Sequence, residues 1–303
     1  MQNAVVKRAA GLRLRKFRER EGAFLAEGAD LVAAGIAAGR RPQVVFVRQG
    51  GAAEAAAAGD AALAGLTVYP LNDRVAAKVS TLETAPDVMA VFPFAERAPI
   101  EALRAGGERS AAPLVVYADR IADPGNMGTL LRAAAAFGAA ALVTAPASVD
   151  LFGPKTVRAS MGAVFALPLY HDMALADLVA RLGATRVYGL VAHGGAPLGD
   201  AELRRPAVLC VGAERAGLAA ETLARVTDQL TIELAQTRGL IGAGLAGATL
   251  DAGPSAAVES LNAGVAGAIA LYEFARRDAA TRASVTTRPG PSAGRSTHAP
   301  EKE

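Results

Sequence analysis

The sequence predicts an α/β protein of two units, the second of which is built on a mainly parallel sheet. Apolar segments of strand length alternate along the chain with segments of helical periodicity. In the second half the strands are continuously apolar, which is typical of a parallel sheet covered by helices on both faces. A polar stretch rich in Gly and Ala, residues 98–112, divides the two halves and is predicted to be a linker.

The first unit, residues 1–97, is predicted to be a small α/β domain. Its strand candidates are rich in β-branched and aromatic residues, and glycines or charged residues bound them. Strands are expected at residues 22–28, 43–48, 66–70 and 87–94, and helices at residues 29–39 and 52–64.

The second unit, residues 113–277, repeats the alternation with longer apolar runs. Strands are expected at residues 113–119, 140–145, 185–192, 207–212 and 229–234, and helices at residues 129–137, 174–182, 221–226 and 261–277. Residues 278–303 contain few large apolar side chains and show no periodicity, so they are predicted to be a disordered tail.

Composition excludes several classes of protein. The single cysteine, Cys210, lies inside an apolar strand candidate, so there is no disulfide framework and no zinc set. The histidines are scattered without the spacing of metal ligands, and no metal site is expected. The chain has neither an uncharged run of membrane-spanning length nor the apolar core of a signal peptide. These features together predict a soluble protein of the reducing cytoplasm.

The first twenty residues are strongly basic, with Glu19 as their only acid, although the net charge of the chain is only +3. One interpretation is a solvated amphipathic helix, and the other is a face that contacts RNA phosphates. Charge alone does not decide between them. The candidate RNA-binding residues are Lys7, Arg8, Arg13, Arg15, Lys16 and Arg18.

A glycine-rich segment, residues 242–247, fits the G-x-G-x-x-G pattern of a dinucleotide-binding turn. A working turn of this kind directly follows a strand, opens a helix and has an acid about twenty residues later. Here AQTRGLI separates the pattern from the preceding strand candidate, Asp251 comes too early, and Pro254 interrupts any helix. The glycines are therefore interpreted as a loop, and an NAD-dependent oxidoreductase is the least favoured function.

Three other segments carry side chains suited to chemistry. In the first, Asp-Pro-Gly makes a turn and Asn126 is suited to cap the following helix, on which Gly128 and Arg132 share one face. Gly128 is expected to leave open space one turn before the guanidinium of Arg132. The alternative interpretation of this segment is an ordinary capped helix with a surface arginine.

The second segment follows the strand AVLCVG, where Gly212 ends the strand and Glu214 comes two residues later. A glycine at the carboxyl end of a strand lets a ligand approach the backbone, and open α/β sheets bind ligands at these ends. In the third segment, Ser260 and Asn262 begin the last predicted helix, where free N–H groups and short polar side chains suit a polar ligand.

The patterns N-x-G-x-x-x-R, G-x-E-x-x-G-L and S-L-N, in this order, resemble the three motifs of the SpoU (TrmH-type) RNA ribose 2′-O-methyltransferases of the SPOUT superfamily. Residues 151–169 look like the segment between the family's first two motifs. Residues 22–28 and 78–92 are similar to the L30e-like RNA-binding domain that many members carry. The resemblance runs from about Val6 to Arg277.

The resemblance implies a trefoil knot at the carboxyl end of the sheet, S-adenosylmethionine as the cofactor, and a homodimer whose sites are completed by the partner. Ribosomal RNA is the expected substrate, with transfer RNA as the second choice. The implied catalytic residues are Asn126, Arg132, Glu214, Ser260 and Asn262. The implied cofactor-binding residues are Ala192, Gly212, Ile232, Leu234 and Leu261.

The resemblance leaves two points open. The first is the role of Arg132, because a free guanidinium stays protonated in neutral water. Arg132 either acts as a base in a site that favours loss of its proton, or stays charged and stabilises the developing alkoxide. The segment 235–258, ahead of Ser260, is longer than in the family. A catalytically weak RNA-binding or ribosome-assembly protein on the same fold is therefore the alternative function, and base methylation by a related knotted fold is a further one.

Overall fold

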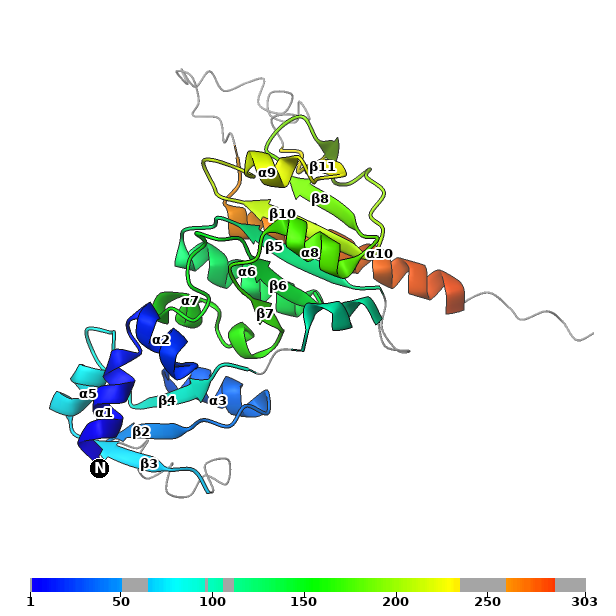
Figure 1. The fold of residues 1–303 in the computed structure, drawn as a ribbon. Coiled ribbons are helices and arrows are strands. Elements are labelled where there is room, and N and C mark those ends of the chain that lie inside the picture. Colours follow the sequence, from blue (N-terminus) through cyan, green and yellow to red (C-terminus); the bar gives the residue numbers. More distant parts are fainter. Residues whose placement is uncertain (1, 51–64, 96–97, 106–111, 235–259, 287–303) are drawn as a thin grey trace, which may run out of the picture.

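The computed structural model describes residues 2–50, 65–95, 98–105, 112–234 and 260–286, and these form two units, each built on its own sheet (Figure 1). The N-terminal unit, residues 2–95, contains a sheet with the strand order β1-β4-β2-β3. Strand β4 is antiparallel to both β1 and β2, whereas β2 and β3 are parallel. Its elements are α1 (Gln2–Gly11), α2 (Arg15–Glu21), β1 (Ala23–Glu27), α3 (Ala29–Ala37), β2 (Val44–Arg48), β3 (Val68–Leu71), α5 (Asp73–Val79) and β4 (Val88–Pro93).

Side chains of the N-terminal sheet alternate between two apolar layers because successive residues of a strand point to opposite faces. Ala23 and Leu25 pack with buried residues of α1 and α5, such as Ala9 and Val79. Phe24 belongs to the other layer, which includes buried residues of α3 and of the C-terminal unit. The predicted strands of this unit are confirmed, and the predicted helix 52–64 lies outside the described residues.

The C-terminal unit, residues 98–286, contains a seven-stranded sheet with the order β7-β6-β5-β10-β8-β11-β9. All of its strand pairings are parallel, as the continuous apolar runs predict. Its elements are η2 (Ile100–Ala105), β5 (Leu114–Asp119), α6 (Pro124–Ala136), β6 (Ala141–Thr144), α7 (Pro154–Ala159), η3 (Ala163–Phe165), β7 (Leu169–Tyr170), α8 (Leu175–Leu182), β8 (Arg186–Leu190), β9 (Ala196–Pro197), β10 (Ala207–Gly212), α9 (Ala220–Leu223), β11 (Asp228–Thr231) and α10 (Ala263–Thr286).

Helices cover both faces of this sheet. Val116 of β5 and Leu209 of β10 pack in one layer with buried side chains of α6 and α10. The next residues along those strands, Tyr117 and Cys210, point into the opposite layer, formed with α8. The chain moves outward from β5 through β6 to β7 and then continues on the other side of β5, so the strand order reverses between β5 and β10. Open α/β sheets bind ligands at such a reversal.

Two predicted boundaries are wrong. Part of the predicted linker forms the 3-10 helix η2, in which Ile100 is buried and Arg181 of α8 pairs with Glu101, so this segment packs on the C-terminal unit. The tail predicted from residue 278 begins inside α10, which continues through Thr286. No glycine or proline interrupts this extension, and the next proline is Pro289. Among the described residues, no helix is long and apolar enough to cross a membrane.

The start of α6 also differs from the prediction. The helix begins at Pro124, and the N-cap is Asp123, whose carboxylate accepts a hydrogen bond from the N–H of Asn126 at 2.8 Å. Proline is favoured at the first helical position because its fixed φ suits a helix and its missing N–H would have no partner there. Asn126 therefore lies in the first turn with its side chain available for another contact.

Asp123→Ala is expected to destabilise the protein by about 1 kcal/mol, because the substitution removes the carboxylate that caps α6. The midpoint of thermal unfolding should then fall by about 2–4 °C. The comparison variant Asp123→Asn retains a cap-forming oxygen and should unfold near the wild-type temperature. A midpoint unchanged in the alanine variant would show that the cap adds nothing to stability.

Candidate active site

A tight loop follows β10 and brings two backbone segments into contact. Ala213 and Gly217 exchange hydrogen bonds, with N···O distances of 3.2 and 2.8 Å, and Gly217 has a φ of +63°. A Cβ atom on Gly212 would lie 2.3 Å from the carbonyl carbon of Gly217. Glycine is therefore required at the strand end because the loop folds directly over it.

A buried carboxylate holds this loop, and the sequence analysis did not identify it. Asp119 ends β5, pairs in register with Gly212, and is 1% exposed. Its Oδ2 accepts a hydrogen bond from the N–H of Ala219 at 2.6 Å, directly after the loop. Buried carboxylates need such partners, so Asp119 holds the far end of the loop, where the chain enters α9. The one sequence signal was an acid at the end of an otherwise apolar strand.

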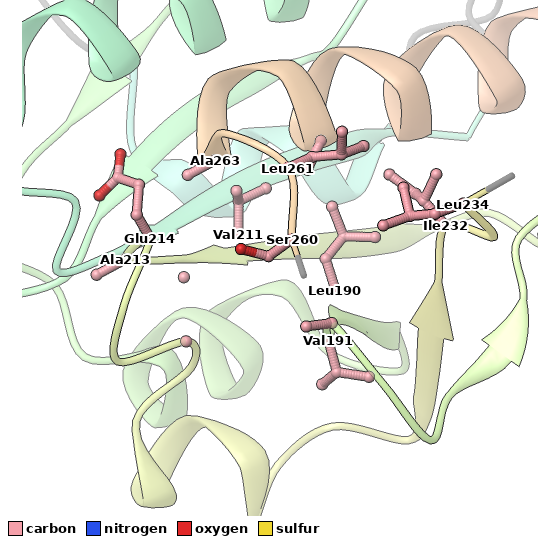
Figure 2. A pocket seen from close by; sticks show the side chains of 14 residues that line it. Leu190, Val191, Val211, Ala213, Glu214, Ile232, Leu234, Ser260, Leu261 and Ala263 are labelled. Atoms are coloured by element: carbon pink, nitrogen blue, oxygen red, sulfur yellow. The ribbon is translucent and has the colours of Figure 1, made fainter. Parts of the chain in front are cut away.

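A pocket lies beside the loop, at the carboxyl ends of β8, β10 and β11 (Figure 2). The space between its lining residues is about 630 Å³ when the open mouth is included. Every residue predicted to bind the cofactor lines it, and so do the predicted catalytic residues Glu214 and Ser260. The lining residues are Leu190, Val191, Ala192, Val211, Gly212, Ala213, Glu214, Gly217, Ile232, Leu234, Ser260, Leu261, Ala263 and Ala266.

The pocket lining suits a ligand that is part apolar and part polar. Figure 2 shows the aliphatic side chains of Leu190, Ile232 and Leu261 gathered on one side, with the Glu214 carboxylate and the Ser260 hydroxyl as polar groups. Gly212 adds main chain without a side chain. An adenosine carrying a charged amino-acid-like tail, as in S-adenosylmethionine, fits this combination of surfaces.

The first and third motifs meet next to the pocket. The side-chain amide of Asn262 donates a hydrogen bond to Oδ1 of Asn126 at 2.5 Å. Asn262 also caps α10, because its own Oδ1 accepts from the N–H of Val265 at 3.2 Å. Helices α10 and α6 approach closely at Gly264, where a Cβ atom would lie 2.9 Å from the carbonyl oxygen of Asn126. Segments far apart in the sequence are thus joined beside Leu261, which lines the pocket.

Arg132 lies on α6 with an exposed side chain and is not among the described residues that line the pocket. The expectation that Gly128 leaves open space before it is wrong. Gly128 is buried, and a Cβ atom there would lie 2.3 Å from the Cβ of Ala159 in α7. This glycine therefore allows α6 and α7 to pack, and Arg132, one turn further along α6, is exposed.

The basic N-terminal residues differ in exposure. Lys7, Arg13 and Lys16 are exposed. Arg8 pairs with Glu21, and Arg15 pairs with both Glu19 and Asp172. The hydrogen bond to Glu19 raises the pKa of Arg15. In contrast, Arg18 is 4% exposed, so its predicted contact with RNA does not fit its position.

Cys210 is not among the described residues that line the pocket. Cys210 is fully buried in β10, and burial raises the pKa of its thiol. The described part of the chain holds no group of His, Cys, Asp or Glu side chains arranged to bind a metal ion.

A parallel sheet with a pocket at the carboxyl ends of three of its strands defines the class of protein as an α/β protein that binds a small molecule at that edge. Residues 113–240 match the model of the SpoU rRNA Methylase family, and residues 3–90 match the MRM3-like substrate binding domain. A TrmH-family protein of known structure from Porphyromonas gingivalis is 31% identical, with 90% of this chain and 97% of that chain covered and a TM-score of 0.69. The chain belongs to the SpoU (TrmH-type) family of RNA methyltransferases, which use S-adenosylmethionine.

Two further similarities concern the cofactor and the substrate of related proteins. The AdoMet-bound rRNA methyltransferase from Sinorhizobium meliloti is 26% identical, with 92% of this chain and 96% of that chain covered and a TM-score of 0.70. The Bacillus subtilis protein RlmP, a 23S rRNA (guanosine(2553)-2′-O)-methyltransferase, is 28% identical over 275 residues, 90% of this chain and 96% of RlmP. The chain spans 40% of the longer mitochondrial rRNA methyltransferase 3A of Danio rerio.

Proposed function

We propose that this protein transfers a methyl group from S-adenosylmethionine to the 2′-hydroxyl of a ribose in structured RNA, and that this RNA is ribosomal. The observation that carries the proposal is the joining of the three motifs at one pocket. The second motif forms the loop over Gly212, the third contributes Ser260 and Leu261 to the lining, and Asn262 binds Asn126 of the first. The rRNA methyltransferases among its relatives support the choice of substrate.

Bound S-adenosylmethionine would supply a methyl group already activated by the positive sulfur. The residues of the pocket then have to hold that methyl in line with a ribose hydroxyl, since orientation alone contributes much of the rate. Gly212, Ile232 and Leu261 would bind the adenosine part. The Glu214 carboxylate and the Ser260 hydroxyl would orient polar groups at the mouth.

Arg132 would act on the ribose hydroxyl rather than on the cofactor. A guanidinium beside that oxygen stabilises the alkoxide that develops as the proton leaves. Arg132 is exposed on α6 and lies outside the pocket lining of its own chain. We infer that a second copy of the chain completes the site, so that the arginine of one copy serves the pocket of the other.

An apolar stripe on α10 supports the homodimer. Val265, Ile269 and Tyr272 are 43%, 37% and 53% exposed, and their spacing places them on one face of the helix. Because α10 also packs on α6 and begins beside the pocket, a second copy seated on this face would lie near both the pocket and Arg132.

Ile269→Glu is expected to weaken self-association on the order of 10²-fold, because the substitution would bury an unpaired carboxylate in the interface. Sedimentation velocity over a range of protein concentrations measures this. Ala180→Glu, at an exposed position of α8 on the opposite face of the sheet, is the matched control and should leave association unchanged. Equal association of both variants would place the interface elsewhere.

We propose further that the C-terminal unit forms a trefoil knot and that the N-terminal unit is an L30e-like domain. The knot is supported by the three separate segments that form the pocket, which follow β8, β10 and β11, together with the start of α10. The L30e-like assignment is supported by the four-stranded sheet and by the match to a substrate-binding domain.

The proposed RNA-binding face includes the exposed Lys7, Arg13 and Lys16, with Arg8 and Arg15 beside them. Lys16 and Arg20 both lie over the ring of Phe17, at 5.4 and 4.5 Å from its centroid, which holds these cations on the surface of α2. Arg18 is left out of this face because it is buried. Contacts of this kind are electrostatic, so RNA binding should weaken steeply as salt rises.

The test of the function is transfer of tritium from labelled S-adenosylmethionine to unmodified ribosomal RNA, followed by digestion to nucleosides. We expect the label in a single ribose-methylated nucleoside, and transfer RNA as the competing substrate should receive much less. Retention of ribosomal RNA without any label would instead support the RNA-binding alternative. Label on a base would assign the chemistry of the related knotted enzymes.

A further inference from the structure

Among the described residues, three ion pairs join the two units of one chain. The pair between Arg15 and Asp172 is largely exposed. We call the two more buried pairs the interdomain clamp: Glu27 with Arg158, and Arg18 with Asp150. Glu27 ends β1 of the N-terminal unit, and Arg158 lies on α7 of the C-terminal unit. Arg18 lies on α2, and Asp150 follows β6. Figure 1 shows α2 and α7 at the junction between the two sheets.

Glu27 is a fully bonded buried carboxylate. Its side chain is 1% exposed, and Oε2 accepts a hydrogen bond from Nη1 of Arg158 at 2.7 Å. The same carboxylate accepts bonds from the Ser80 hydroxyl and from both the N–H and the hydroxyl of Thr81, at 2.6 to 2.7 Å. Arg158 also donates to the Thr81 hydroxyl at 2.8 Å. Arg158 of the C-terminal unit therefore binds two segments of the N-terminal unit, one at Glu27 and the other at Thr81.

In the second ion pair, between Arg18 and Asp150, further hydrogen bonds also hold both side chains in place. The side chain of Arg18 is 5% exposed, and its Nη2 lies 2.5 Å from Oδ2 of Asp150. Its Nη1 donates to the carbonyl of Leu12 at 2.6 Å, within its own unit. Asp150 accepts a further bond from the N–H of Phe152 at 2.8 Å. Arg18 and Asp150 are thus each held by a hydrogen bond within their own unit, and the ion pair between them joins the two units.

Aromatic side chains also pack across the junction between the two units. Phe94 of the N-terminal unit stacks on Phe152 of the C-terminal unit with ring centroids 4.3 Å apart, and Phe92 packs on Phe165 at 4.8 Å. A Cβ atom on Gly35 would lie 2.6 Å from the Phe92 ring and 3.0 Å from the Phe165 ring. The apolar layer is therefore continuous across the junction, in contrast to the polar interfaces that allow units to move.

We propose that the interdomain clamp locks the two units of one chain into a single rigid body, and that Glu27, Arg158, Arg18 and Asp150 are positioning residues for RNA. The lock fixes the distance between the basic face of the N-terminal unit and the methyl-transfer site. RNA held on that face is then presented at one position, and the ribose that is modified depends on this geometry. The RNA part of this inference rests on the proposed function, whereas the lock does not.

The lock is tested with spin labels on cysteines introduced at Ala77 of α5 and Asp177 of α8, both exposed. Cys210 is fully buried and should not react. Labelled chains are diluted with unlabelled ones so that only distances within one chain are measured by pulsed dipolar spectroscopy. We expect a narrow distance distribution that broadens in Glu27→Gln and in Asp150→Asn. A broad distribution in the parent protein, or a narrow one in both variants, would overturn the lock.

The matched control is Asp278→Asn. Asp278 pairs with Arg205 inside the C-terminal unit, with side chains 29% and 11% exposed, close to the 22% and 5% of Asp150 and Arg18. This variant should lose a comparable ion pair and some thermal stability without broadening the distance distribution.

Single-turnover methylation separates positioning from stability. Well below the unfolding temperature, Glu27→Gln and Asp150→Asn should slow methylation of structured RNA at least about tenfold, because misplaced reactants react slowly. The dissociation constants for RNA and S-adenosylmethionine should stay within about twofold, and Asp278→Asn should methylate at the wild-type rate. Wild-type rates in both clamp variants would refute the positioning role. A narrow distribution in a protein that never methylates RNA would reject the proposed function and leave the lock intact.

Discussion

Arg132→Ala is expected to reduce methyl transfer on the order of 10²–10³-fold while the protein still binds S-adenosylmethionine and RNA. The expectation follows from the position of the side chain, which is exposed on α6 and outside the pocket lining of its own chain. Removing it should leave the cofactor site unchanged and take away a cation that stabilises the developing alkoxide. Loss of one such donor costs about 10²–10³ in rate in other enzymes.

The measurement is the single-turnover rate with saturating RNA and cofactor, together with cofactor binding by calorimetry. Arg132→Lys keeps the charge without the planar fork of donors and should recover only part of the rate. Arg181→Ala, an exposed arginine on α8 that pairs with Glu101, is the matched control and should be fully active. Near-normal turnover in Arg132→Ala would remove this residue from the mechanism.

Gly212→Val is expected to abolish cofactor binding. Its Cβ atom would lie 2.3 Å from the carbonyl carbon and 2.4 Å from the carbonyl oxygen of Gly217, which are backbone atoms without freedom to rotate away. The loop over the strand end must therefore shift, and Glu214 shifts with it. Overpacking of this kind costs about 1–3 kcal/mol of stability, and a displacement of about 1 Å near reacting groups costs on the order of 10²-fold in rate.

Gly199→Ala provides the comparison, because no atom lies within 4 Å of the Cβ that it would introduce. Its stability and its affinity for S-adenosylmethionine should match those of the parent protein. Calorimetric titration of both variants distinguishes a local clash from a general effect of losing glycine. Cofactor binding at wild-type affinity by the valine variant would show that the loop is free to move.

Strand positions could be predicted from the sequence because they depend on local patterns. Continuous apolar runs such as residues 113–119 and 207–212 form neighbouring parallel strands, as their composition requires. Short elements, including α7, β7 and β9, carry too few residues to show a period. The helical course of α10 past residue 278 is not predicted, because a lack of large apolar side chains is typical of disorder, although this segment contains no helix breaker.

The candidate site could be predicted only in part. The pocket residues came from the resemblance to the SpoU family, and the fold brings them to one place. Hydrogen-bond and ion-pair partners that lie far apart in the sequence cannot be predicted from local sequence patterns. Asp119 and Glu27 are acids in apolar strands whose partners lie about 100 and 131 residues away. Arg18 looked like its basic neighbours in α2, although it alone among the RNA-binding candidates is buried against Asp150.

The hydrogen bond between Asn126 and Asn262 has a consequence for the order of binding events. Leu261 lines the pocket, and the next residue both caps α10 and holds the first turn of α6. A ligand that restrains Leu261 therefore also restrains the helix that carries Arg132. By linkage, the binding energy of the cofactor is shared with that helix, whose amides should exchange with solvent more slowly once the pocket is filled. By the same linkage, RNA that binds against this helix should bind more tightly to the form of the protein that already holds the methyl donor.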